Sequence, residues 1–230
     1  MKSFFMLMLL IVVQFCTAQQ LQYSDQRLGK WMSFRSNTWL TKNVALYAER
    51  NYRHYQILPS IEQFAFRIGA FYRADSSRFM FGGGYASLKN VSPEDEIVEI
   101  YQSEMRLWQH VSYAHVCGRL HYDFRYRAEQ RLINNVYLRH RLRLQNTIPL
   151  NKPKMEKNTV YFYSELEFFL NSTPSYYDRT RYHLSLGYMP FTGIHVMVGF
   201  SHDFNEVYNR KYFNFTFAYD VDLTKKINKK

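Results

Sequence analysis

The clearest pattern in this chain is a strict alternation of apolar and polar side chains in residues 119–130. One parity carries Leu120, Tyr122, Phe124, Tyr126 and Ala128, and the other carries Arg119, His121, Asp123, Arg125, Arg127 and Glu129. Residues two apart share one face of a strand, whereas a helix would mix these aromatic and charged groups on every side. The pattern therefore predicts a β-strand with one aromatic face and one ionic face.

The same period-two alternation recurs along the rest of the chain. The further segments that show it are 29–40, 44–55, 61–73, 78–88, 97–115, 136–148, 159–170, 179–189, 194–204 and 211–223. Hairpin-length connections join most of them, which predicts an up-and-down antiparallel sheet. Because single-chain bacterial barrels usually have an even number of strands, we expect twelve, with the extra one at residues 20–26 and both termini at the same end. A ten-stranded barrel is the alternative.

Composition suggests which solvent the apolar face meets. The aromatic content is 18%, with 20 Tyr and 19 Phe, more than the core of one small domain usually needs. Tyr and Trp are favoured at membrane interfaces, and about 9–11 tilted residues cross a bilayer as a strand. No stretch approaches 18 consecutive apolar residues, and the mean hydropathy is −0.42, which excludes helical spans. The sequence thus predicts an all-β, transmembrane β-barrel.

The N-terminus predicts export. Lys2, an apolar run over residues 4–13 and the small residues Cys16 and Ala18 are typical of a secretory signal peptide at 1–18, followed by one barrel domain at 19–230. The alternative, acylation of Cys16, is disfavoured by the bulky Phe15 before it. We therefore expect a monomer in the outer membrane, in contact with lipid and lipopolysaccharide and inserted there by the barrel-assembly machinery. Export also argues against nucleic acid as the partner of the +11 net charge.

If the apolar rows face lipid, the lumen receives the charged rows, which contain eleven arginines and five carboxylates. The predicted lumen cluster is Glu104, Arg106, Asp123, Arg125, Arg127, Glu129, Arg139, Arg141, Arg143, Glu165 and Glu167. One interpretation is structural, with arginine–carboxylate ladders filling a small barrel. The other is a narrow cation-lined passage or pocket for anionic solutes. Open aqueous channels typically need about 16 strands or more, so a closed lumen is favoured.

Two alternative functions remain open from the residues. His183 and Ser185 share a strand face, and Glu165 belongs to a neighbouring strand, a set that would suit a lipid hydrolase. The polar loop predicted at 89–96 would suit a cell-surface binding platform. No spacing typical of a metal site is present, and we expect no cofactor.

Several segments together resemble a known family. They are Tyr47-Ala-Glu-Arg50, Phe81-Gly-Gly-Gly-Tyr85, Glu104-Met-Arg-Leu-Trp-Gln109, Phe124-Arg-Tyr-Arg-Ala-Glu-Gln-Arg131 and Tyr137-Leu-Arg-His-Arg-Leu-Arg143. Over nearly the whole mature chain the sequence is similar to the family known as domain of unknown function 2490. The resemblance implies an outer-membrane β-barrel of Bacteroidota type with no assigned activity, and it assigns no catalytic or ligand residues.

Overall fold

The computed structural model describes residues 28–57, 61–74, 78–91, 101–133, 136–173, 176–205 and 209–224. Among them no helix is long and apolar enough to cross a membrane. The strands of this part of the chain are β1 (Leu28–Trp39), β2 (Val44–His54), β3 (Ile61–Arg73), β4 (Phe79–Val91), β5 (Tyr101–Cys117), β6 (Leu120–Leu132), β7 (Val136–Pro149), β8 (Thr159–Asn171), β9 (Tyr177–Phe191), β10 (Ile194–Phe204) and β11 (Asn209–Asp222).

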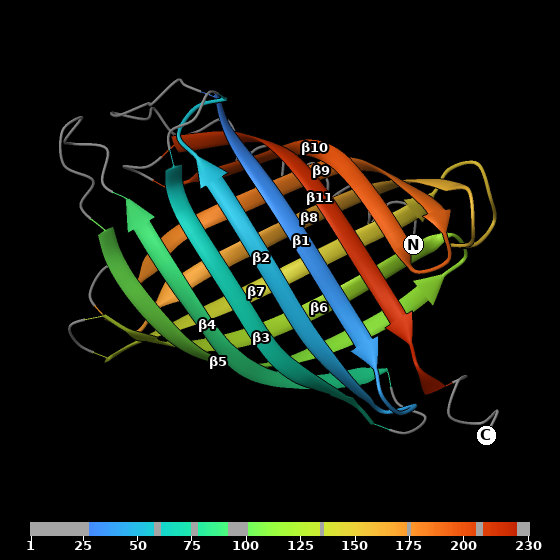
Figure 1. The fold of residues 1–230 in the computed structure, drawn as a ribbon, viewed down its shortest axis with the longest axis horizontal. Helices are drawn as coiled ribbons and strands as arrows, with labels where there is room; N and C mark the ends of the chain where they lie inside the picture. Colours follow the sequence, from blue (N-terminus) through green and yellow to red (C-terminus); the bar gives the residue numbers. More distant parts are fainter. Residues whose placement is uncertain are drawn as a thin grey trace, which may run out of the picture.

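These strands form one closed barrel in which each strand pairs with its neighbours in the sequence (Figure 1). All pairs are antiparallel except the closing one, in which β1 and β11 run in the same direction, with Leu28 opposite Lys211 and Trp39 opposite Asp222. The predicted all-β, up-and-down barrel is confirmed. The described residues contain eleven strands, which lies within the predicted range of 10–12 but differs from the favoured twelve.

The parallel closure explains why a twelfth strand is not needed. β1 uses one edge for β2 and the other for β11, so the barrel has no free edge among its described strands. The strand predicted at 20–26, like the signal peptide at 1–18, lies outside the described residues. Because β1 and β11 are parallel, Leu28 and Asp222 lie at opposite ends of the barrel.

The two ends of the barrel differ in their connections. At one end, called the turn end, two-residue turns join β5 to β6 and β9 to β10, and Gly118 and Gly193 supply the positive φ that such turns require. One long connection also lies there, residues 150–158 between β7 and β8. The opposite end is called the loop end. The loop predicted at 89–96 is partly wrong, because Lys89–Val91 belong to β4; residues 92–100 lie outside the described chain.

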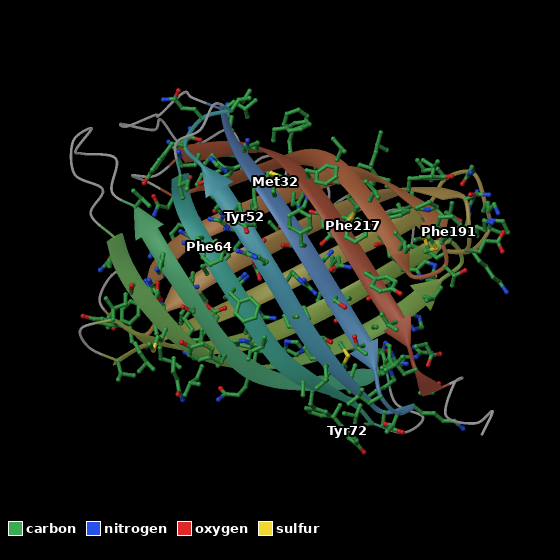
Figure 2. The ribbon with its side chains drawn as sticks, viewed as in Figure 1. Met32, Tyr52, Phe64, Tyr72, Phe191 and Phe217 are labelled. Carbon is green, nitrogen blue, oxygen red and sulfur yellow. The ribbon has the colours of Figure 1, made fainter. Side chains whose placement is uncertain are left out.

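The predicted sidedness of the strands is confirmed. Side chains of the apolar rows project outward, including the labelled Met32, Tyr52, Phe64, Tyr72, Phe191 and Phe217 (Figure 2). On β6, for example, Phe124 is 52% exposed, whereas Arg127 on the opposite face is 3% exposed. The barrel therefore has an inverted polarity, with large apolar groups outside and ionic groups inside.

The glycines of β4 make room for large rings inside the barrel. A Cβ on Gly82 would lie 2.5 Å from the Phe71 ring, and one on Gly84 would lie 2.6 Å from the Trp108 ring. Trp108 is only 1% exposed and packs with Phe71 among the buried residues of this side of the lumen. Gly82 and Gly84 are thus required by packing against inward-facing aromatics.

Candidate binding site in the barrel lumen

All residues of the predicted charge cluster lie on the inner face of the barrel. Each of them forms an ion pair, and each side chain is at least four-fifths buried. β6, β7 and β8 position most of them, because the inner faces of these strands carry mostly Arg, Asp or Glu, and β5 adds Glu104 and Arg106 near its loop end. Arg119, which the sequence pattern also placed in the lumen, is instead on the β5–β6 turn and donates hydrogen bonds to the carbonyl groups of Leu150 and Lys152.

An alternating series of cations and carboxylates, called here the ion-pair chain, crosses the loop-end half of the lumen from β5 to β10. It runs through Arg131, Glu104, Arg106, Glu129, Arg141, Glu167, Arg181 and Asp203. Arg141 lies at its centre, donating to Glu129 Oε1 at 2.5 Å and to Glu167 Oε2 at 2.7 Å. At the β10 end, Arg181 binds both oxygens of Asp203, each at 2.5 Å.

The carboxylates of the ion-pair chain are almost inaccessible to solvent. Glu104, Glu129, Glu167 and Asp203 are each 0–1% exposed. A buried carboxylate is stable only where cations and hydrogen-bond donors replace its water shell, and each of these four contacts at least two arginines. The ion-pair chain therefore places across this half of the lumen a series of charged groups that satisfy one another.

The lumen contains two regions of empty space, one against the ion-pair chain near the centre of the barrel and one toward the turn end. The central cavity measures about 110 Å³, and Arg35, Glu49, Arg67, Glu165 and Arg181 are among its lining residues. The turn-end pocket measures about 500 Å³. Both are lined by Arg35, Tyr47, Arg125, Arg127, Arg143, Tyr163 and Met197, so these residues form a shared boundary.

Charge is not balanced around the central cavity. Ten arginines line it against three carboxylates, Glu49, Glu165 and Glu167. These arginines also contact four carboxylates that do not line the cavity: Glu104, Asp123, Glu129 and Asp203. With these four included, the described residues oppose seven carboxylates to the ten arginines. Water and salt screen charges at a protein surface, but they screen a buried excess of cations poorly. The lumen therefore presents a positive potential to anything that enters it.

Arg35 on β1 is the cation that contributes most directly to this excess. It lines both the central cavity and the turn-end pocket, and among the described residues no carboxylate lies within ion-pair distance of it. The neighbouring arginines each have a partner: Arg125 contacts Glu167 at 2.8 Å, and Arg143 contacts Asp123 at 2.8 Å. Arg35 thus faces both spaces without an ion-pair partner among the described residues.

Several buried donors around the turn-end pocket also lack acceptors in the described chain. They are the Nε atoms of Arg125, Arg127 and Arg143, and Nε2 of His110 is likewise without a partner. Leaving a buried donor unsatisfied costs about 1–3 kcal/mol, and more for a charged group. These unsatisfied donors and Arg35 together leave the surroundings of the pocket rich in positive charge and short of acceptors.

Sequence reasoning missed part of this lumen. Arg35, Glu49, Arg53, Asp203 and Arg210 face inward but were not among the predicted lumen residues. The available signal was the parity of their own strands: on β1, Met32 and Phe34 mark the outer face, which places Arg35 inside. Apolar and charged residues alternate less regularly in β1, β2 and β10 than in the middle strands, so the inner faces of these strands are harder to assign from sequence.

The residues predicted as a hydrolase set lie close together but are poorly accessible. His183 Nε2 and Ser185 Oγ are 2.6 Å apart, and Glu165 pairs with His183 across β8 and β9. Glu165 accepts a hydrogen bond from Tyr163 at 2.7 Å and contacts Arg143 at 3.6 Å. Ser185 is 4% exposed and lines neither the central cavity nor the turn-end pocket. The geometry orients His183 and Ser185 but gives a substrate no route to the hydroxyl group.

Among the described residues, metal-binding groups and thiols are two other features that could carry chemistry. No group of three His, Cys, Asp or Glu side chains there is arranged to hold a metal ion. Cys117 is an exposed free thiol at the end of β5 and lies beside the turn at Gly118. The turn-end pocket therefore remains the feature with the clearest capacity to bind a ligand.

Comparison with known proteins adds a family but no activity. No curated protein and no solved structure matches the chain. The family model described as "Protein of unknown function (DUF2490)" matches residues 28–214, which extend from the first residue of β1 into β11. This barrel, with its aromatic exterior and arginine-rich lumen, therefore belongs to the DUF2490 family.

Proposed function

We propose that this chain is an outer-membrane β-barrel that binds an anionic solute in its lumen and does not conduct ions across the membrane. The observation that carries the proposal is the inverted polarity of the barrel. Its exterior exposes Phe, Tyr and Leu side chains, whereas its interior buries more arginines than carboxylates. Such a protein needs an apolar solvent outside and favours a negative charge inside.

The exterior supports the membrane location. The strands contain 11 to 17 residues, and about 9–11 tilted residues are enough to cross the hydrocarbon core. Closure of the sheet pairs every strand edge, as lipid requires of a spanning β-structure. The signal peptide predicted at 1–18 provides the route of export. Two-residue turns favour a periplasmic position for the turn end, and the turn-end pocket then opens toward the periplasm.

The ion-pair chain supports a closed barrel. It occupies the loop-end half of the lumen with side chains that are bound to one another, and its carboxylates are fully buried. A barrel of eleven strands is also narrower than the roughly 16-stranded barrels that hold aqueous channels. An anion that enters from the turn end would therefore reach the arginines and stop there.

The test uses the full mature chain, folded in detergent and reconstituted into planar bilayers. We expect heat-modifiable mobility on electrophoresis, no single-channel current steps, and a saturable change in tryptophan fluorescence on adding inorganic phosphate. The fluorescence should report on the lumen because Trp31 lines the central cavity and Trp108 is buried beside it. A neutral sugar serves as the control and should leave the fluorescence unchanged.

The membrane location, the closed lumen and the anion binding can each be contradicted by a separate result. A chain that folds to a compact, soluble form without detergent would contradict the membrane location. Regular current steps would contradict the closed lumen. A phosphate titration with no saturable response, in protein shown to be folded by its electrophoretic mobility, would contradict anion binding.

A lipid hydrolase is the second candidate, because His183 and Ser185 are within hydrogen-bonding distance and Glu165 faces His183 across the strand pair. It is the weaker candidate. A nucleophile must reach the ester it attacks, and the Ser185 hydroxyl opens into neither lumen space. The anion-binding proposal uses side chains that already line a cavity.

A further inference from the structure

We propose that the ligand of the turn-end pocket is a single-chain anionic amphiphile, whose charged head contacts Arg35 and whose apolar part lies against a wall of methionine and aromatic side chains. This inference rests on the proposed anion-binding function and adds the class of ligand. It follows from the division of the pocket into a cationic floor and an apolar wall.

The floor of the turn-end pocket is cationic. Arg35, Arg125, Arg127 and Arg143 line it, and all four also line the central cavity, so they lie where the two spaces meet. Two carboxylates also line the pocket. Asp123 is bound by Arg143 at 2.8 Å, and Asp220 accepts a hydrogen bond from Asn37 at 2.7 Å. Neither forms an ion pair with Arg35, so its guanidinium can bind a head group that carries negative charge.

The wall of the pocket differs in chemistry from the floor. Met80, Met155, Met189 and Met197 line the pocket together with Phe71 and Tyr161. Tyr161, Tyr163 and Met197 form one buried cluster against which Met155 packs, and Phe71 belongs to a second cluster that includes Met80 at its margin. Methionine side chains are flexible and polarizable and adapt to apolar groups of varied shape. A small inorganic anion would leave this wall unused.

Met155 belongs to the β7–β8 connection, residues 150–158, which is longer than the other connections at the turn end. Within it, Lys152 pairs with Glu156 at 2.9 Å, and the Asn151 side chain donates to the Asn158 carbonyl at 3.0 Å. Arg119 fixes the start of the connection through the Leu150 carbonyl at 2.9 Å. The connection is therefore held in place while Met155 contacts the pocket wall. Because Met155 lies outside the strands, it can be substituted without disturbing the barrel.

The test compares hexyl phosphate, heptanoate, inorganic phosphate and hexanol as probes of the full mature chain held in lipid nanodiscs, with tryptophan fluorescence as the readout. Burial of the alkyl chain should make hexyl phosphate bind at least about tenfold more tightly than inorganic phosphate. Heptanoate distinguishes a carboxylate head from a phosphate head, and hexanol should bind poorly because it lacks the charge. Empty nanodiscs measure the partition of each probe into lipid.

Three variants separate the roles of floor and wall. Arg35→Gln should weaken hexyl phosphate and inorganic phosphate alike, by about tenfold or more, because both lose a charge-assisted contact. Met155→Gln should weaken hexyl phosphate but leave inorganic phosphate unchanged. Arg50→Gln is the matched control, since Arg50 lies on the outer face of β2 over the rings of Tyr52 and Phe64 and lines neither cavity. It should change neither affinity.

The outcomes distinguish this inference from the function on which it rests. Equal affinity for hexyl phosphate and inorganic phosphate, or no effect of Met155→Gln, would overturn the amphiphile while leaving anion binding intact. Absence of binding by every charged probe would overturn both. Binding that is insensitive to Arg35→Gln would place the head group elsewhere and would also overturn the assignment.

Discussion

The two halves of the lumen are built by the same strands but in opposite ways. In the loop-end half, inward arginines alternate with carboxylates, and Arg141 between Glu129 and Glu167 is typical of the arrangement. In the turn-end half, the same strands supply Ser112, Gln145 and Tyr161, so carboxylates are fewer there. Paired charges predominate in the first half, whereas arginines in the second face about 500 Å³ of open pocket.

The comparison shows what decides whether an arginine in a barrel is structural or available to a ligand. Arg141 and Arg35 are both lumen cations, but Arg141 binds two buried carboxylates and Arg35 binds none among the described residues. A buried ion pair need not add stability over an apolar pair, but breaking one leaves an uncompensated charge. Removal of a partner should therefore be costly in the loop-end half and tolerated in the turn-end half.

The largest effect is expected for Glu167→Gln. Glu167 contacts Arg125, Arg141 and Arg181, and the neutral amide would leave Arg125 without a carboxylate among the described residues. We expect the free energy of unfolding in detergent to fall by about 3–5 kcal/mol, as is typical of a broken buried pair. Urea titration followed by heat-modifiable electrophoretic mobility measures it.

Asp123→Asn is the matched control in the turn-end half. It makes the same chemical change, but Arg143 keeps a second carboxylate, Glu165, at 3.6 Å. Its cost should be about 0–1 kcal/mol, as for a partly exposed pair. Equal losses in the two variants would remove the distinction between the halves.

A second prediction tests whether the outer face of β6 meets lipid. Phe124 lies on the outer side of β6 between two inward charged residues, Asp123 and Arg125, and is 52% exposed. If the exterior meets lipid, Phe124→Arg should lower stability by about 2–4 kcal/mol near the middle of the bilayer. The fraction of protein that assembles in the outer membrane measures this effect.

Leu132→Arg, at the loop end of the same strand, is the control for the second prediction. A cation there is near the membrane surface and should cost about 0–1 kcal/mol. Normal assembly of the Phe124 variant would mean that this surface does not face lipid, and the proposed location would fall with it.

The sequence predicts which side chains of a strand face inward or outward much better than it predicts which strands pair with one another. Period-two alternation is a local property, so Phe124, Arg125 and Tyr126 could be assigned to faces from the sequence alone. Closure of the barrel is not local. Whether β1 meets β11 in parallel or a twelfth strand intervenes depends on strand tilt and stagger around the whole barrel, which no single segment encodes.

The candidate site shows the same limit. The arginines of β6 and β7 could be placed in the lumen by parity, but which of them find carboxylates depends on the stagger between strands. Arg125 contacts Glu167, which is two strands away on β8, although Glu104 and Glu129 are nearer in the sequence. The pocket wall was also beyond prediction, because Met155 reaches it from a connection that has no strand periodicity.

The third prediction, Arg125→Gln, concerns this unexpected pairing at the boundary between the halves. Glu167 would keep Arg141 and Arg181, and the variant would remove a guanidinium whose Nε has no acceptor in the described chain. The free energy of unfolding should therefore change by only about 1 kcal/mol in either direction. Arg141→Gln, measured in parallel, should lose more, because it deprives both Glu129 and Glu167 of a partner.

A small effect is also expected for Ser185→Ala, which tests the hydrolase alternative at the edge of the ion-pair chain. The variant removes one hydrogen bond, that between His183 and Ser185, and should cost about 0.5–1.5 kcal/mol or less because no charge is left unpaired. If the His183 and Ser185 pair is structural, lipid extracts from cells that express the variant should match those from wild-type cells. A lipid that accumulates only in the Ser185→Ala cells would show that the hydroxyl group acts on a substrate, and the lumen would then have to open farther than its described geometry allows.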